Sequence, residues 1–170
     1  MVAAWPWFAA VGLAIAGYLL GTWRRYGRDP GHAVPWRTVL LVVDPELGTV
    51  PLPAVRVALR LVGRGGLLHV LTPVRVPLAM PLEAPAGEDT ERATVLLDQV
   101  ERLAGEEGVA VRGHLRRGRT LRTMLAEVAT LVQADAVVLP LRAEQPERSL
   151  ELAGLVAPAQ AIIVPGSAGE

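Results

Sequence analysis

The hydrophobic and polar positions divide the chain into two parts. The first is an apolar N-terminal run, and in the second short apolar runs alternate with amphipathic stretches. The segment from Val2 to Trp23 contains no charged side chain. A helix of about 20 apolar residues, rising ~1.5 Å per residue, spans the hydrocarbon layer of a bilayer. Aromatic side chains occur towards both ends of the run, as is common at membrane interfaces. The pattern therefore predicts a transmembrane anchor over residues 1–23.

A cleaved signal peptide is the alternative interpretation of this run. The residues before the run include no Lys or Arg, and Arg24, Arg25 and Arg28 follow it instead of a small-residue cleavage site, so the anchor is favoured. Basic residues that flank a span stay on the cytoplasmic side. We therefore expect a single-pass protein of a bacterial inner membrane, with its N-terminus outside, a linker over 24–37 and a cytoplasmic domain.

Small residues follow one face of the predicted anchor. Their steps of four, three and four positions place them along one side of a helix, and the last two have small-xxx-small spacing. Such a stripe lets a second helix approach closely, although small residues are common in membrane helices generally. Besides contact with membrane lipid, we expect packing on an integral membrane partner through Ala10, Ala14, Gly17 and Gly21.

Beyond residue 37, short apolar runs alternate with amphipathic stretches. Apolar, β-branched runs are typical of buried parallel strands, whereas apolar residues at intervals of three and four are typical of helices. Strands are predicted at 38–43, 67–72, 109–115, 136–141 and 161–164, and helices within 55–62, 89–104, 121–132 and 149–156. This order favours right-handed crossovers between parallel strands. We expect an α/β fold with a doubly wound, mostly parallel five-stranded sheet over 38–166, followed by a tail at 167–170.

A proline-rich segment separates the second predicted strand from the next helix. Pro73, Pro77, Pro81 and Pro85 recur at every fourth position. Proline interrupts helices and central strands, so the segment is predicted to be a loop from Pro73 onward. The residues between the prolines are unusually apolar for an exposed connection. They are expected to cover the domain itself, the bilayer surface or a protein partner.

Composition and charge exclude several kinds of function. All 17 basic residues are arginine, and four of them with one of the 17 acidic residues precede residue 38, so the domain has a net charge of −3. A mildly acidic domain is a poor nucleic-acid binder. The chain has no cysteine, and its three histidines are far apart in sequence, so no metal-ligand spacing is present. Ser149 and Ser167 lie outside any nucleophile motif. We expect a non-enzymatic protein with no cofactor, no metal and no nucleic-acid partner.

The predicted order of elements, together with local segments, resembles the universal stress protein domain across nearly the whole of 38–165. The segments that carry this resemblance are the strand ending in Asp44, Leu68-His69-Val70, Gly108-Val109, Gly118, the run from Ala134 to Leu139, and Ala157-Pro158 before Ile162-Ile163-Val164. The resemblance implies the five-stranded α/β fold described above. It also allows homodimerisation through the last strand, whose outer edge is expected to be unpaired.

Members of that family that bind ATP carry two glycines after the fourth strand and a Gly-Ser or Gly-Thr at the next helix. In this sequence Pro140 and Ala143 take the glycine positions, Glu147-Arg148 replaces Gly-Ser, and the spacing between them is too short. Proline offers no amide hydrogen, and a glutamate repels phosphate. We therefore expect that the domain does not bind ATP in the family's way.

Two groups of residues remain as candidates for binding an anionic ligand. Asp44 ends a parallel strand, and α/β sheets bind ligands at that edge; a loop-capping role is the alternative. Arg116, Arg117, Arg119 and Thr120 lie at the entrance to a predicted helix, where backbone amides favour anions. A solvated basic edge that pairs with nearby glutamates or faces lipid headgroups is the alternative for this cluster.

Together these features favour a non-enzymatic accessory or regulatory subunit of a larger membrane complex. In this interpretation the anchor stripe and the cytoplasmic surface both contact the complex. The competing hypothesis is a sensor on the cytoplasmic side that binds a nucleotide or another anion in a modified site.

Overall fold

The computed structural model describes residues 36–63, 66–83, 87–141, 146–156 and 159–165. The predicted anchor with its stripe of Ala10, Ala14, Gly17 and Gly21, nearly all of the linker, Ala143 and the tail at 167–170 lie outside these residues. Within the described ranges, no helix is both long enough and apolar enough to cross a membrane. The anchor and its orientation therefore stay predictions.

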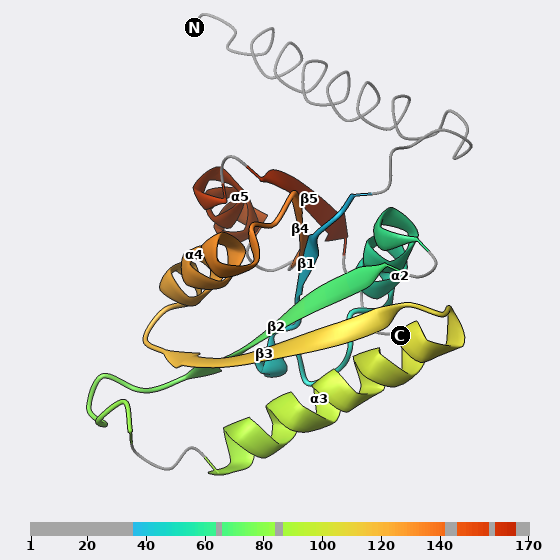
Figure 1. Ribbon diagram of the computed structural model, residues 1–170. Coiled ribbons are helices and arrows are strands. Elements are labelled where there is room, and N and C mark those ends of the chain that lie inside the picture. The colour runs from blue at the N-terminus through green and yellow to red at the C-terminus, as the bar shows by residue number, and fades with distance from the viewer. Residues whose placement is uncertain (1–35, 64–65, 84–86, 142–145, 157–158, 166–170) are drawn as a thin grey trace, which may run out of the picture. The chain divides into compact units, whose positions relative to one another are not determined.

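A five-stranded sheet lies at the centre of the described domain (Figure 1). Its strands are β1 (Val39–Val42), β2 (Leu67–Arg75), β3 (Ala110–Gly118), β4 (Ala136–Leu141) and β5 (Gln160–Pro165). The strand order is β3-β2-β1-β4-β5, and every neighbouring pair is parallel. The predicted parallel α/β sheet is thus confirmed. β5 forms one edge of this sheet, so the homodimer expected through it has a suitable strand and remains a prediction.

Helices cover both faces of the sheet, as Figure 1 shows. On one face lie α2 (Leu52–Val62) and α3 (Gly87–Glu106), and on the other α4 (Leu121–Val132) and α5 (Pro146–Leu155). Side chains alternate along β1, so that Leu41 packs towards α2 and Leu40 towards α4, and both are fully buried. Burial on both faces explains why β1 is apolar at every position.

The ends of α4 follow from local chemistry. Thr120 has an extended backbone, and its hydroxyl oxygen accepts a hydrogen bond from the Thr123 N–H at 3.2 Å. Gln133 ends the helix in the left-handed region, with φ of 52°. A side-chain acceptor at the first position satisfies an amide that the helix leaves unpaired. The helix predicted at 121–132 is therefore confirmed, and Thr120 caps it.

The prediction that a loop begins at Pro73 is wrong, because β2 continues through Pro73 to Arg75. β1 pairs with β2 only as far as Leu71, whereas β3 accompanies β2 to Arg75. The carbonyl of Leu71 accepts a hydrogen bond from the N–H of Val43, the residue that follows β1, so the backbone groups of alternate residues from Leu71 onward point to that side. The missing N–H of Pro73 thus falls where β1 has already ended, and no ladder bond is lost.

The apolar residues of the proline-rich segment divide into two groups. Val74 and Val76 are buried, at 1% and 4% exposed. Leu78, Met80 and Leu82 lie in the turns after β2 and are 88%, 41% and 43% exposed. The first group covers the domain itself, and the second forms an exposed apolar loop, which we define as Leu78, Met80 and Leu82.

Candidate functional site

Asp44 follows β1 at the carboxyl edge of the sheet and is 4% exposed. Its Oδ1 accepts a hydrogen bond from the Glu46 N–H at 3.1 Å, which caps the short 3-10 helix η1 (Pro45–Leu47). Proline at the first position and Gly48 in the left-handed region, with φ of 69°, fit this turn. The loop-capping role proposed for Asp44 is therefore present in the structure.

The other carboxylate oxygen of Asp44 contacts Arg75, which β2 carries to the same edge. The Arg75 Nη2 lies 3.0 Å from Asp44 Oδ2, and Nη1 lies 2.6 Å from Glu46 Oε1. One guanidinium thus bridges two carboxylates, a geometry that its planar fork favours. Its buried Nε has no hydrogen-bond partner among the described residues. Sequence reasoning missed Arg75 because the segment after Pro73 was interpreted as a loop.

A cavity of about 410 Å³ opens beside this ion-pair group. Such a volume suits a small molecule. Three acidic and three basic side chains line it, so its formal charge is balanced. The charged lining residues are Asp44, Glu46, Asp89, Arg75, Arg92 and Arg119, and the remainder are Pro45, Pro73, Val74, Val76, Pro77 and Leu78.

The arginines of this pocket are already engaged with the protein. Arg92 lies 3.0 Å from the Glu88 carboxylate and 3.7 Å from that of Asp89. Arg119 donates hydrogen bonds to the carbonyl oxygens of Val76, at 3.2 Å, and of Pro77. With Arg75 bound to Asp44 and Glu46, each lining cation has a protein acceptor. A polyphosphate entering the pocket would compete with these contacts.

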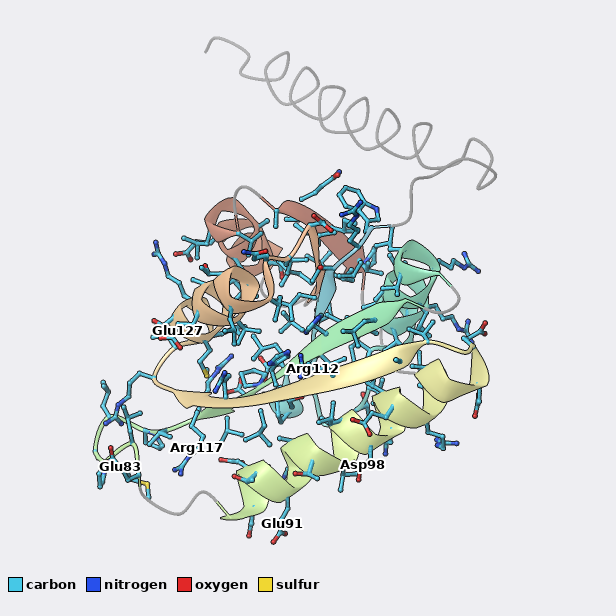
Figure 2. All side chains as sticks on the ribbon, viewed as in Figure 1. Glu83, Glu91, Asp98, Arg112, Arg117 and Glu127 are labelled. Carbon is cyan, nitrogen blue, oxygen red and sulfur yellow. The ribbon has the colours of Figure 1, made fainter. Side chains whose placement is uncertain are left out.

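The residues that the sequence placed together at the entrance to α4 lie on different surfaces. Arg119 lines the pocket with Asp44, whereas Thr120 caps α4. Arg116 and Arg117 are neighbours in β3, so their side chains point to opposite faces of the sheet. Figure 2 shows Arg117 on the side of β3 opposite to Arg112. Of the predicted ligand-binding residues, all of which lie in the described ranges, only Asp44 and Arg119 line the same pocket.

The region that corresponds to the family's phosphate loop is described only in part. Pro140 lies within β4 and pairs in register with Val164 of β5. The connection 142–145, which includes Ala143, lies outside the described residues, and α5 begins at Pro146. Proline at position 140 removes one amide hydrogen from the carboxyl end of β4.

Two histidines that are far apart in sequence meet across β2 and β3. The Nδ1 of His69 lies 2.9 Å from the Nε2 of His114, and the rings stack with centroids 5.2 Å apart. Burial, followed by the charges of His114 and Arg112, lowers the pKa of His69 below its usual value of about 6.5. Burial, followed by Arg116 and Arg112, likewise lowers the pKa of His114.

Sequence reasoning did not find this histidine pair, because only the register of the two strands brings the rings together. In the register His69 stands opposite Arg112, and His114 stands opposite Leu71. The described residues contain no cluster of three or more side chains able to hold a metal ion.

No protein-family model and no curated protein matches the chain. Solved structures of universal stress proteins do match it. The protein from Archaeoglobus fulgidus in complex with dAMP is 22% identical, with a TM-score of 0.55 over 76% of this chain and 98% of that chain. The protein from Arabidopsis thaliana with AMP bound is 14% identical, with a TM-score of 0.58 over 77% and 92%. A member of the family from Burkholderia pseudomallei is 17% identical, with a TM-score of 0.56 over 79% and 100%. At these identities the likeness concerns the fold alone: the described domain has the universal stress protein fold.

Proposed function

We propose that this chain is a non-enzymatic, membrane-tethered module with the universal stress protein fold, and that it serves as an accessory or regulatory subunit of a larger membrane complex. The ion pairs of Arg75 with Asp44 and Glu46 are the observation that carries the proposal. These three side chains lie at the carboxyl edge of the sheet, where α/β folds bind ligands, and there they bind one another. In this proposal the module acts through contact and does not bind ATP in the family's way.

The balanced charge of the pocket supports this absence of ATP binding. A triphosphate requires an excess of cationic or amide donors, whereas each pocket arginine already has a protein acceptor. Pro140 at the end of β4 removes one amide from the same edge.

The exposed apolar loop supports a contact function. Leu78 is 88% exposed, and Met80 and Leu82 are each more than 40% exposed on one short segment. Apolar side chains gathered on a surface mark interaction sites, and methionine adapts to varied partners. In this proposal the apolar run of Val2–Trp23 tethers the domain that carries this loop to the membrane.

Purification of the tagged full-length chain in mild detergent tests the contact function. We expect an integral membrane protein to accompany the chain and to be lost when Leu78, Met80 and Leu82 are all changed to Ser. Leu131→Ser is the matched control, because Leu131 is an apolar side chain on α4 that is 62% exposed. A lone monomer, or equal loss of the partner in the control, would refute the proposal.

A ligand sensor is the second candidate function, and the cavity of about 410 Å³ favours it. The pocket lies at the carboxyl edge of the sheet, and two proteins of the same fold were solved with AMP or dAMP. A monophosphate would need less cationic charge than ATP does.

A thermal-shift titration of the full-length chain with ATP, AMP and cyclic dinucleotides separates the two functions. A ligand at 100 times its dissociation constant stabilises the folded state by about 2.7 kcal/mol, which is readily measured. We expect no stabilisation by millimolar nucleotide. A shift with AMP that Arg119→Gln reduces, while Arg56→Gln on the outer face of α2 leaves it unchanged, would establish the sensor instead.

A further inference from the structure

The histidine pair lies on the same face of the sheet as α4. Neither histidine lines the pocket at the carboxyl edge. The glycines of β3 identify the two faces. A side chain at Gly113 would meet Leu97 of α3, whereas one at Gly118 would meet Met124 of α4. Because alternate strand residues share a face, Arg112, His114 and Arg116 lie on the α4 side together with Gly118.

His114 stands between two exposed arginines on this face. Alternate residues of a strand are about 6.6 Å apart, a distance that a flexible arginine side chain can reach across. Both arginines lie near enough for their charge to act on His114. His69 is 7% exposed and His114 is half-buried, so the pair is approached mainly from the His114 side.

The positive charge of this face is not neutralised by the described acidic residues. Arg112 and Arg116 form no ion pair with any of them. β1 carries no charged residue, and Arg75, at the far end of β2, binds Asp44 and Glu46. On α4, Arg122 lies 3.6 Å from Glu151 of α5, and Glu127 forms no ion pair within the described ranges.

The hydrogen bond between the rings determines what the pair can offer a ligand. One proton lies between His69 Nδ1 and His114 Nε2, so the neutral pair presents one N–H and one bare nitrogen on its remaining sides. Uptake of one further proton, the third of the pair, turns both remaining nitrogens into donors. A ligand with negative charge and several acceptor oxygens would neutralise the positive charge of that proton and of the two arginines, and would accept their hydrogen bonds.

We propose that Arg112, His114, His69 and Arg116 form a second binding site, which takes an oxyanion of the phosphate or sulfate class and binds a proton together with it. The ligand bridges the two guanidinium groups above His114. The same chemistry is offered by a soluble phosphate compound and by the phosphate of an anionic lipid headgroup. Because the pocket beside Asp44 takes no part, this site is independent of the proposed contact function.

Sulfate is the probe of choice, because its charge stays constant over the pH range in which histidine titrates. The full-length chain, labelled with ¹⁵N-histidine and held in non-ionic detergent, has three imidazole rings to observe by NMR. At pH 6 we expect sulfate to shift the signals of His69 and His114, and chloride at equal ionic strength to leave them unchanged. An equal response to both salts would overturn the proposal.

A double variant tests the arginines against a matched control. Arg112→Gln with Arg116→Gln is expected to weaken sulfate binding at least tenfold. Arg56→Gln with Arg60→Gln removes the same charge at the same spacing from the exposed face of α2, on the other side of the sheet, and should leave the affinity unchanged. Equal affinity in the two double variants would overturn the assignment.

The dependence on pH tests the histidines. If one proton binds with the anion, the affinity should fall about tenfold per pH unit above the pKa of the pair, by reciprocal linkage. His114→Gln keeps a polar side chain and should flatten that slope while sulfate still binds weakly through the arginines. A wild-type affinity that does not change between pH 5.5 and 7.5 would exclude the histidine pair from the site.

Nanodiscs distinguish the two sources of the anion. The experiment adds an anionic phospholipid to neutral nanodiscs without sulfate. Shifts of the NMR signals of His69 and His114 would then identify a lipid headgroup as the ligand. Shifts caused only by sulfate or inorganic phosphate would identify a soluble ligand. No shift in either arm would refute the site.

Discussion

Replacing Arg75 with Met would test whether the ion-pair group fixes the carboxyl edge of the sheet. The variant keeps the apolar part of the side chain and removes both ion pairs. Asp44 is 5% exposed in its side chain and would stay buried after losing the ion pair with Arg75. Loss of one member of a fully buried pair costs about 3–5 kcal/mol. Arg75 is 24% exposed and Asp44 keeps its bond to the Glu46 N–H, so we expect about 2 kcal/mol.

Thermal unfolding followed by circular dichroism measures this effect. For a domain of this size, 2 kcal/mol corresponds to a decrease in Tm of roughly 6–10 °C. A double-mutant cycle with Asp44→Asn should give a coupling energy of about 1–2 kcal/mol between Arg75 and Asp44. Arg60→Met on the exposed face of α2 is the control, with an expected change within about 0.5 kcal/mol.

Two results would refute this reasoning. If Arg75→Met changed Tm no more than Arg60→Met does, the bridge would not contribute to stability. If the effects of Arg75→Met and Asp44→Asn on the free energy of unfolding were additive, the two side chains would have no interaction energy despite their short distance.

Three further predictions concern the fold and the histidine pair. Thr120→Ala should lower the free energy of unfolding by about 1 kcal/mol through loss of the α4 cap, whereas Thr120→Ser should retain most of it, as urea unfolding can measure. Leu125→Ala should cost about 2–5 kcal/mol, because Leu125 is fully buried between α4 and the sheet; an equal loss for the exposed Leu131→Ala would contradict this. Burial lowers the pKa of His69 and His114 in the folded chain below the usual value of about 6.5. As the pH falls through 6.5, the unfolded chain therefore binds more protons than the folded chain does. The stability that is present above that pH is consequently lost on acidification. His114→Gln should therefore reduce the fall in Tm between pH 7.5 and 5.5, and an unchanged fall would show that other groups cause it.

The sheet and its helices could be predicted from the sequence because their patterns are local. β1 is apolar throughout, and α4 shows helical spacing with a threonine cap, so each element is visible within its own residues. The continuation of β2 through Pro73 could not be predicted in this way. It depends on where β1 ends, which is a property of a strand distant in sequence.

The candidate site was predictable only in part for the same reason. Asp44 was found because the end of a parallel strand is a ligand-binding position whatever the rest of the chain does. Arg75 and the histidine pair were not found, because their partners lie 31 and 45 positions away in sequence. Arg116 and Arg117 appeared to belong to one cluster until the pleat of β3 separated them.

The sequence by itself determined the order of the elements and their approximate bounds, the apolar run at the N-terminus and the proline at the end of β4. These features follow from hydrophobic periodicity and from the backbone chemistry of single residues, which neighbouring positions reveal. Only the tertiary structure decided that Arg75 bridges Asp44 and Glu46 and that His69 meets His114 between two arginines. Strand order and register bring these side chains together, and they result from packing over the whole domain, which no local pattern records.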